Sequence, residues 1–156
     1  MLEWIESFAI AVWLRESASV WSHPTVLTLH TMGMAVLVGA SWVLDLRLLG
    51  VNRKTPLSAF RWVFPVVVVG LTVNLVTGAL LFAKNATSWG TAAPFLIKMS
   101  LVIASVATVV PLRKYVLQSD LDQGEAGRAR LLAIVSILAW SGAVTAGRLL
   151  AYLVVT

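Results

Sequence analysis

Four long apolar stretches set the limits on what this chain can fold into. They run from Ser17 to Leu44, from Trp62 to Ala83, from Pro94 to Leu112 with one interruption at Lys98, and from Leu131 to Thr156 with one at Arg148. A helix needs about 20 residues, rising about 1.5 Å each, to cross a hydrocarbon core of about 30 Å. Each stretch reaches or approaches that length. The sequence therefore predicts an all-α membrane protein with four transmembrane spans.

Composition agrees with that class and removes several others. Hydrophobic residues make up 59% of the 156 residues and charged residues 12%, which is about half the charged fraction of a soluble domain. The absence of cysteine excludes disulfides and thiolate metal sites. The net charge of +5 lies in the connections between spans and is not gathered into a patch, so we expect no nucleic-acid partner. We expect one domain, residues 1–156, in contact with the lipid bilayer.

Short connections predict an antiparallel four-helix bundle with spans at about residues 22–46, 61–83, 94–113 and 129–155. Residues 1–20 predict an amphipathic helix on the outer membrane surface, because their apolar side chains share one side of a helical wheel. On span two, Gly70, Asn74 and Gly78 recur every four residues, a spacing that lets two helix backbones approach closely. We assign Asn74 a structural role there, as a hydrogen-bond partner of a neighbouring helix.

Lysine and arginine are distributed unevenly between the connections. Eight lie in the first and third connections: Arg47, Arg53, Lys54, Arg61, Arg113, Lys114, Arg128 and Arg130. The second connection has Lys84 and the N-terminal segment has Arg15. Because basic loops stay in the cytoplasm, both termini are expected on the outer side of the membrane.

Several motifs occur in a fixed order along the chain. They are WVLDLRLLG at 42–50, preceded by His30 and Gly39, then TGALLF at 77–82, FLIKM at 95–99 and GRLLAY at 147–152. Together they resemble a functionally uncharacterised family of small bacterial four-helix membrane proteins with a DLRLLG motif after the first span. The resemblance implies a multi-pass protein of the bacterial inner membrane with periplasmic termini, and no established activity. A looser similarity to small cytochrome b and copper-resistance membrane proteins is an analogy.

Three polar residues fall in the outer third of the membrane. His30 is about 9 Å inside span one, Lys98 about 6 Å inside span three and Arg148 about 10 Å from the end of span four. Tyr152 lies one turn from Arg148 on the same face. A charge that faces lipid costs up to about 3 kcal/mol at such a depth. We therefore expect His30, Lys98, Arg148 and Tyr152 to line one polar pocket, open to the outer face.

Three occupancies of this region remain open. The cations can extend to the headgroups while His30 bonds another helix, without a cofactor. Alternatively His30 can ligate haem b, alone, with Met99 or with a second subunit, while Lys98 and Arg148 hold the propionates. His23 is about 10.5 Å from His30 along the same helix and cannot be the second ligand of that haem. The third option is Cu(I) on His30, Met34 and Met99.

Asp45 and Arg47 are expected to stabilise the cytoplasmic end of span one by pairing at the membrane boundary. No carboxylate or serine–histidine pair in the spans indicates catalysis, so we do not expect an enzyme. The sequence favours an accessory or assembly subunit of a larger membrane complex, or a homo-oligomer, because this needs no cofactor. The alternative is a haem-b-like electron-transfer or membrane-anchor protein with its site near the outer face. Cu(I) binding is the further alternative.

Overall fold

The computed structural model describes residues 2–118 and 121–153. Its elements are α1 (Leu2–Glu6), α2 (Ala9–Glu16), α3 (His23–Leu49), the 3-10 turn η1 (Leu57–Phe60), α4 (Val63–Lys84), α5 (Ala86–Trp89), α6 (Ala93–Gln118) and α7 (Gln123–Leu153). Four segments, those of α3, η1 with α4, α6 and α7, are long and apolar enough to cross a membrane. The all-helical fold with four helices able to cross a membrane is confirmed. The end of the expected fourth span, residues 154 and 155, lies outside the described residues.

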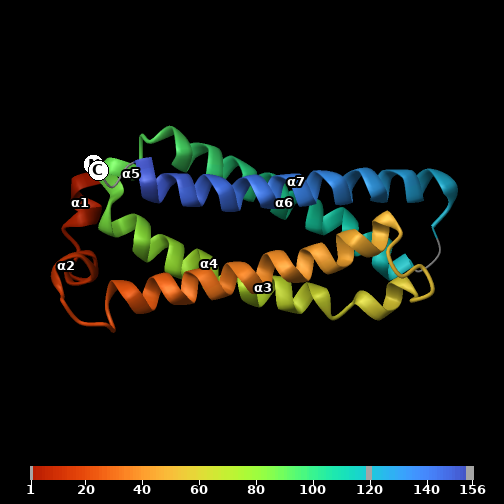
Figure 1. Ribbon diagram of the computed structural model, residues 1–156, viewed down its shortest axis with the longest axis horizontal. Coiled ribbons are helices and arrows are strands. Elements are labelled where there is room, and N and C mark those ends of the chain that lie inside the picture. Colours follow the sequence, from red (N-terminus) through yellow and green to blue (C-terminus); the bar gives the residue numbers. More distant parts are fainter. Residues whose placement is uncertain (1, 119–120, 154–156) are drawn as a thin grey trace.

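The long helices form two pairs. In Figure 1, α3 runs away from the end that holds α1 and α2, and α4 returns beside it; α6 and α7 repeat this course. The closest partners are α3 with α4 and α6 with α7, and the two pairs meet along α3 and α7. The last turns of α7 lie at the same end of the molecule as α1 and α5.

Local hydrogen bonds explain where α3 ends and where α7 begins. After α3 the chain turns at Gly50, whose φ of 109° suits glycine. There the N–H of Gly50 donates to Arg47 O, and the N–H of Val51 donates to Leu46 O, which closes the helix. Before α7, the N–H of Glu125 donates to Asp122 Oδ1 at 2.7 Å and the N–H of Asp122 to Glu125 Oε2 at 3.4 Å. This reciprocal pair is a capping box.

The N-terminal segment differs from the single surface helix that we expected for residues 1–20. It forms two short helices, with the break at Ser7 and Phe8. α1 contacts α5, where Glu6 accepts hydrogen bonds from Thr87, whereas α2 contacts α4. Ala11 and Leu14 of α2 are buried. α1 contacts α4 as well, so both halves of the segment pack against that helix, and the contact with Thr87 belongs to α1.

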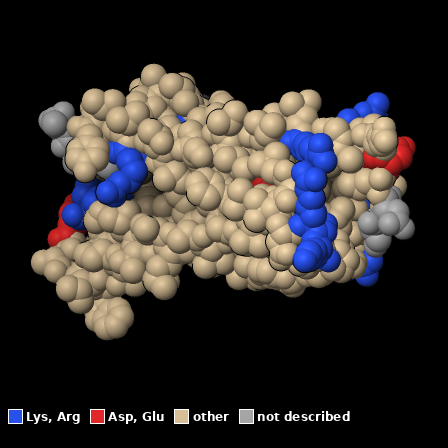
Figure 2. All heavy atoms as spheres, turned by 45° about the vertical axis from the view of Figure 1, so that its right-hand side comes forward, with Lys and Arg blue, Asp and Glu red and all other residues tan. Residues whose placement is uncertain are grey.

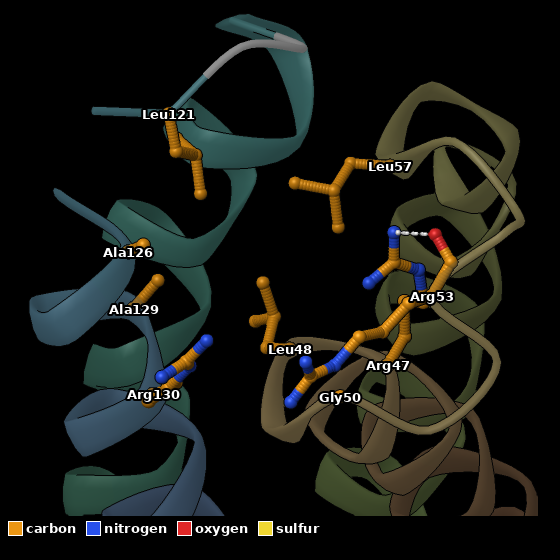
Figure 3. Close-up of a pocket in the computed structure, with 9 residues that line it drawn as sticks. All are labelled: Arg47, Leu48, Gly50, Arg53, Leu57, Leu121, Ala126, Ala129 and Arg130. Atoms are coloured by element: carbon orange, nitrogen blue, oxygen red, sulfur yellow. Dashed lines mark hydrogen bonds between the residues drawn. The ribbon is translucent and has the colours of Figure 1, made fainter. Parts of the chain in front are cut away.

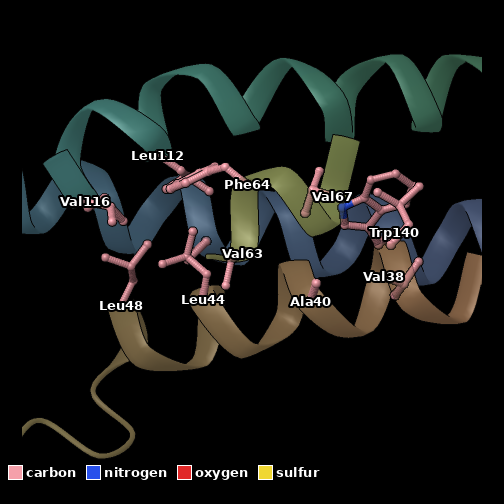
Figure 4. Close-up of a cluster of buried hydrophobic side chains, with 13 residues drawn as sticks. Val38, Ala40, Leu44, Leu48, Val63, Phe64, Val67, Leu112, Val116 and Trp140 are labelled. Carbon is pink, nitrogen blue, oxygen red and sulfur yellow. The ribbon is translucent and has the colours of Figure 1, made fainter. Parts of the chain in front are cut away.

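The hydrophobic core occupies the half of the bundle nearest the first and third connections. Figure 4 shows its side chains meeting from the second half of α3, the start of α4, the second half of α6 and the first half of α7. Its members include Leu37, Val38, Leu44, Leu48, Val63, Phe64, Val67, Leu112, Val116, Ala133 and Trp140. In the other half, the close contacts at Gly33, Gly78 and Gly147 each join the two helices of one pair.

Candidate functional site

His30 lies half-buried on α3, against α4. Its Nδ1 is 2.9 Å from Thr77 Oγ1, and that hydroxyl is 2.6 Å from Val73 O. Because the hydroxyl has a single proton and lies closer to Val73 O, we assign that proton to Val73 O and the Nδ1–H tautomer to His30. Nε2 then carries the free lone pair, and it has no hydrogen-bond partner among the described residues. This side chain is therefore oriented and has one ring nitrogen available.

Small residues bring α3 and α4 together around this histidine. A methyl group on Gly78 would lie 3.2 Å from His30 Cε1, and one on Gly33 would lie 2.8 Å from Asn74 Nδ2. The Asn74 amide donates to Gly70 O, 3.2 Å away in its own helix. The hydrogen bond to another helix that we expected for Asn74 is therefore replaced by packing against Gly33.

Lys98 is half-buried on α6 and crosses Gly147 of α7. A methyl group on Gly147 would lie 3.4 Å from Lys98 Cε and 3.5 Å from Nζ. Arg148 and Tyr152 are exposed. They lie off the buried side of α7, which carries Ala143, Ala146 and Leu150. Arg148 and Tyr152 thus lie on the exposed side of α7, where they can extend toward the headgroups, and one pocket shared by all four polar residues stays a prediction.

The thioether and second-histidine candidates lie in different surroundings. Met34 is partly buried against the hydrophobic core, whereas Met99 is 37% exposed. His23 begins α3, and its Nδ1 is buried without a hydrogen-bond partner in the described part of the chain. No group of three or more histidine, cysteine or acidic residues that could hold a metal ion occurs within residues 2–118 and 121–153.

Asp45 is the most enclosed charged residue that the sequence singled out. Its side chain is fully buried, and Ser136 of α7 donates to Oδ2 at 2.7 Å. Oδ1 has no partner among the described residues, and neither has Trp140 Nε1, one turn further along α7. A cavity of about 10 Å³ adjoins Asp45 and Ser136, walled by apolar side chains such as Phe64 and Leu112. Its size is close to the minimum for one water molecule.

Arg47 faces away from Asp45 toward the loop. Its Nε donates to Thr55 O at 2.8 Å and its Nη2 to Arg53 O at 3.0 Å. The expected pairing of Asp45 with Arg47 is therefore wrong. Two positions along a helix are about 200° apart around its axis, so the two side chains point to different sides.

Sequence reasoning missed Thr77 and Ser136 as partners. Serine and threonine are common in these spans and usually bond a carbonyl of their own helix, as Ser41, Ser100 and Ser141 do here. No sequence signal separates Ser136 from that group. Thr77 could have been noticed because it precedes Gly78 within the TGALLF motif.

Comparison with known proteins gives one match. A sequence profile of a family of unknown function (DUF6644) covers residues 1–153. The comparisons with curated proteins and with solved structures gave no match.

Proposed function

The chain belongs to this family of unknown function, and we propose that it is an accessory or assembly subunit that packs against a larger membrane complex and has no catalytic chemistry of its own. An open face of α3 supports the proposal. Thr28, Thr31, Ala35 and Gly39 lie exposed on one side of that helix. No atom of the described residues lies within 4 Å of the position that a methyl group on Gly39 would take.

Other glycines of the spans are used for close helix contacts. A methyl group on Gly33 would lie 2.8 Å from Val73, one on Gly70 would lie 3.0 Å from Leu37, and one on Gly142 would lie 2.9 Å from Leu101. Small residues allow this approach, and van der Waals packing at such places drives helix association in lipid. Gly39 offers the same surface to the outside of the bundle. A helix of another subunit fits this face better than lipid chains do.

The test compares complexes solubilised from native membranes by a mild detergent. The wild-type protein should migrate with other subunits, and Gly39→Leu should release it at the size expected for the 16.8 kDa chain. Ala107→Leu is the matched control, because Ala107 is an exposed small residue on α6. Migration of the wild-type protein as a monomer would contradict the proposal. A complex made of identical chains alone would make the partner a second copy.

We also propose a bacterial inner-membrane location, with both termini in the periplasm. Lys and Arg side chains form a band across the end of the molecule opposite α1 and α2 (Figure 2). This placement fits the cytoplasmic retention of basic loops. A periplasmic reporter fused after Thr156 should be active, and activity of a cytoplasmic reporter at that position would contradict the orientation.

One observation favours a second candidate, a haem-b-like electron-transfer or anchor protein. The hydroxyl of Thr77 fixes the ring of His30 with Nε2 free, and such a second partner is common for histidines that bind metals. The half-buried Lys98 could pair with a propionate. Protein purified from native membranes should then show a Soret band that His30→Ala removes and His23→Ala retains. A wild-type spectrum without that band would contradict this candidate.

A further inference from the structure

A pocket with three arginines lies where the first connection meets the start of α7. Its volume is about 230 Å³, and Arg47, Arg53 and Arg130 share its wall with Leu48, Leu57 and Leu121. Figure 3 shows Arg130 entering from α7 and Arg53 from the loop on the opposite side. We propose that this pocket binds the phosphate group of an anionic phospholipid headgroup.

None of the described residues that line the pocket is acidic, so they give its positive charge no counterpart. Across the described ranges, none of the three arginines has a carboxylate oxygen within 4.0 Å. Asp122 and Glu125 lie near the pocket in sequence, but their carboxylates accept hydrogen bonds from each other's backbone N–H. An anion from outside the described chain therefore suits this site.

The three arginines of the pocket make different contacts. Arg47 holds the loop by donating to Thr55 O and Arg53 O. Arg53 lies across Gly50, since a methyl group there would be 2.7 Å from Arg53 Nε and 2.8 Å from Nη2. Neither Arg53 nor Arg130 makes a side-chain hydrogen bond to a described residue through its guanidinium. Their N–H groups are available for the two-point contact that guanidinium makes with phosphate.

The remaining wall favours a lipid phosphate over a soluble one. Leucines stand beside the guanidinium groups, and the pocket lies at the ends of two predicted spans. A phospholipid offers a phosphate next to glycerol and acyl chains, which matches this mixed surface. Basic pockets at the cytoplasmic side of helix bundles are suited to anionic headgroups.

The experiment measures binding of fluorescent phosphatidylglycerol and fluorescent phosphatidylcholine to the purified full-length protein in neutral detergent. Phosphatidylglycerol should bind more tightly than phosphatidylcholine. Arg53→Gln with Arg130→Gln should weaken its binding by about tenfold or more, because both substitutions remove charge-assisted hydrogen bonds to the phosphate. The control is Arg113→Gln with Arg128→Gln, which removes equal charge from exposed positions outside the pocket. It should change the affinity by no more than about twofold.

Two further arms identify the source of the phosphate and guard against misfolding. If inorganic phosphate stabilises the wild-type protein but not the pocket variant, and the two lipids bind equally, the phosphate chemistry holds with a soluble ligand. Equal losses of affinity in the pocket and control variants would overturn the proposal. So would a wild-type protein that does not prefer phosphatidylglycerol and is not stabilised by inorganic phosphate. Should the double variant fail to fold, Arg53→Lys and Arg130→Lys, which keep charge without the two-point fork, should each weaken lipid binding.

Discussion

The hydroxyl of Ser136 and the carboxylate of Asp45 meet across the seam between α7 and α3, 2.7 Å apart and buried. These helices belong to different pairs, so this hydrogen bond links the two helix pairs at the level of the hydrophobic core. Asp45 also begins the DLRLLG motif. Its partner lies 91 residues away in the sequence.

Ser136→Ala should lower the free energy of unfolding by about 1–3 kcal/mol, because it leaves a buried carboxylate oxygen without its donor. Unfolding in detergent, followed by circular dichroism, measures this. Ser141→Ala is the control, since its hydroxyl bonds Ile137 O in the same helix. Equal stability of Ser136→Ala and Ser141→Ala would show that the link between the pairs contributes little.

Asp45→Asn should reduce stability or yield without removing a specific ligand or activity. Asparagine keeps an acceptor oxygen for Ser136, so the hydrogen bond can persist in a weaker, uncharged form. Thermal unfolding and ligand binding on the same sample check this. A fully folded Asp45→Asn protein that selectively lost a ligand would place Asp45 in a functional site instead.

Gly50→Ala should destabilise the protein by about 1–3 kcal/mol, the range expected for a strained backbone position. The φ of 109° is unfavourable for alanine, and the new methyl group would overlap the guanidinium of Arg53. Gly127→Ala is the matched control, because no described residue lies within 4 Å of its methyl position and alanine favours the helix. Gly50→Ala should lower the unfolding midpoint, whereas Gly127→Ala should leave it unchanged or raise it.

Gly70→Ala should cost about 1–3 kcal/mol through overpacking. Its methyl group would lie 3.0 Å from Leu37 Cβ and 3.1 Å from Leu37 Cα and N, so relief requires movement of the α3 backbone. Gly147→Ala should be nearly neutral, because its nearest neighbour is the flexible end of Lys98. Denaturant titration of the two variants side by side tests this difference, and equal losses would contradict it.

The N-terminal segment should be sensitive to acid through Glu6. Its carboxylate accepts hydrogen bonds from the Thr87 hydroxyl at 2.6 Å and from the Thr87 N–H at 2.7 Å, and these bonds lower the pKa of Glu6 below its ordinary value. A lowered pKa in the folded state contributes stability above the unfolded pKa, and this is lost as the pH falls through the folded pKa. The stability difference between wild type and Glu6→Gln should therefore be present at about pH 7 and decrease as the pH falls below the ordinary pKa of glutamate, about 4.3. A difference independent of pH would contradict this role.

The spans could be predicted from the sequence because uninterrupted apolar stretches have few alternatives to crossing lipid. The buried side of each span could not. On α3 the exposed Val36 and Leu46 are of the same kinds as the buried Leu37 and Val38. In lipid both the core face and the outer face of a helix are apolar, so periodicity does not distinguish them. This is why Arg148 was expected inside the bundle.

The hydrogen-bond partners of the polar residues could not be predicted from the sequence either. Asp45 was expected to pair with Arg47, two residues away, since nothing marked Ser136 as the closer group. Likewise, nothing in the sequence marked Thr87 as the partner of Glu6 or α4 as the helix that α2 contacts. Such choices depend on which helices become neighbours, and a single sequence does not record that.

Because the core is placed unevenly along the bundle, the two ends of the bundle should differ in their local stability. Large side chains lock the two helix pairs together near the basic loops, whereas toward α1 and α2 the pairs share fewer buried groups. Local opening costs less free energy where fewer apolar contacts must separate. We therefore expect the two helix pairs to separate at a lower free-energy cost at the end near α1 and α2 than at the loop end, where the hydrophobic core joins them.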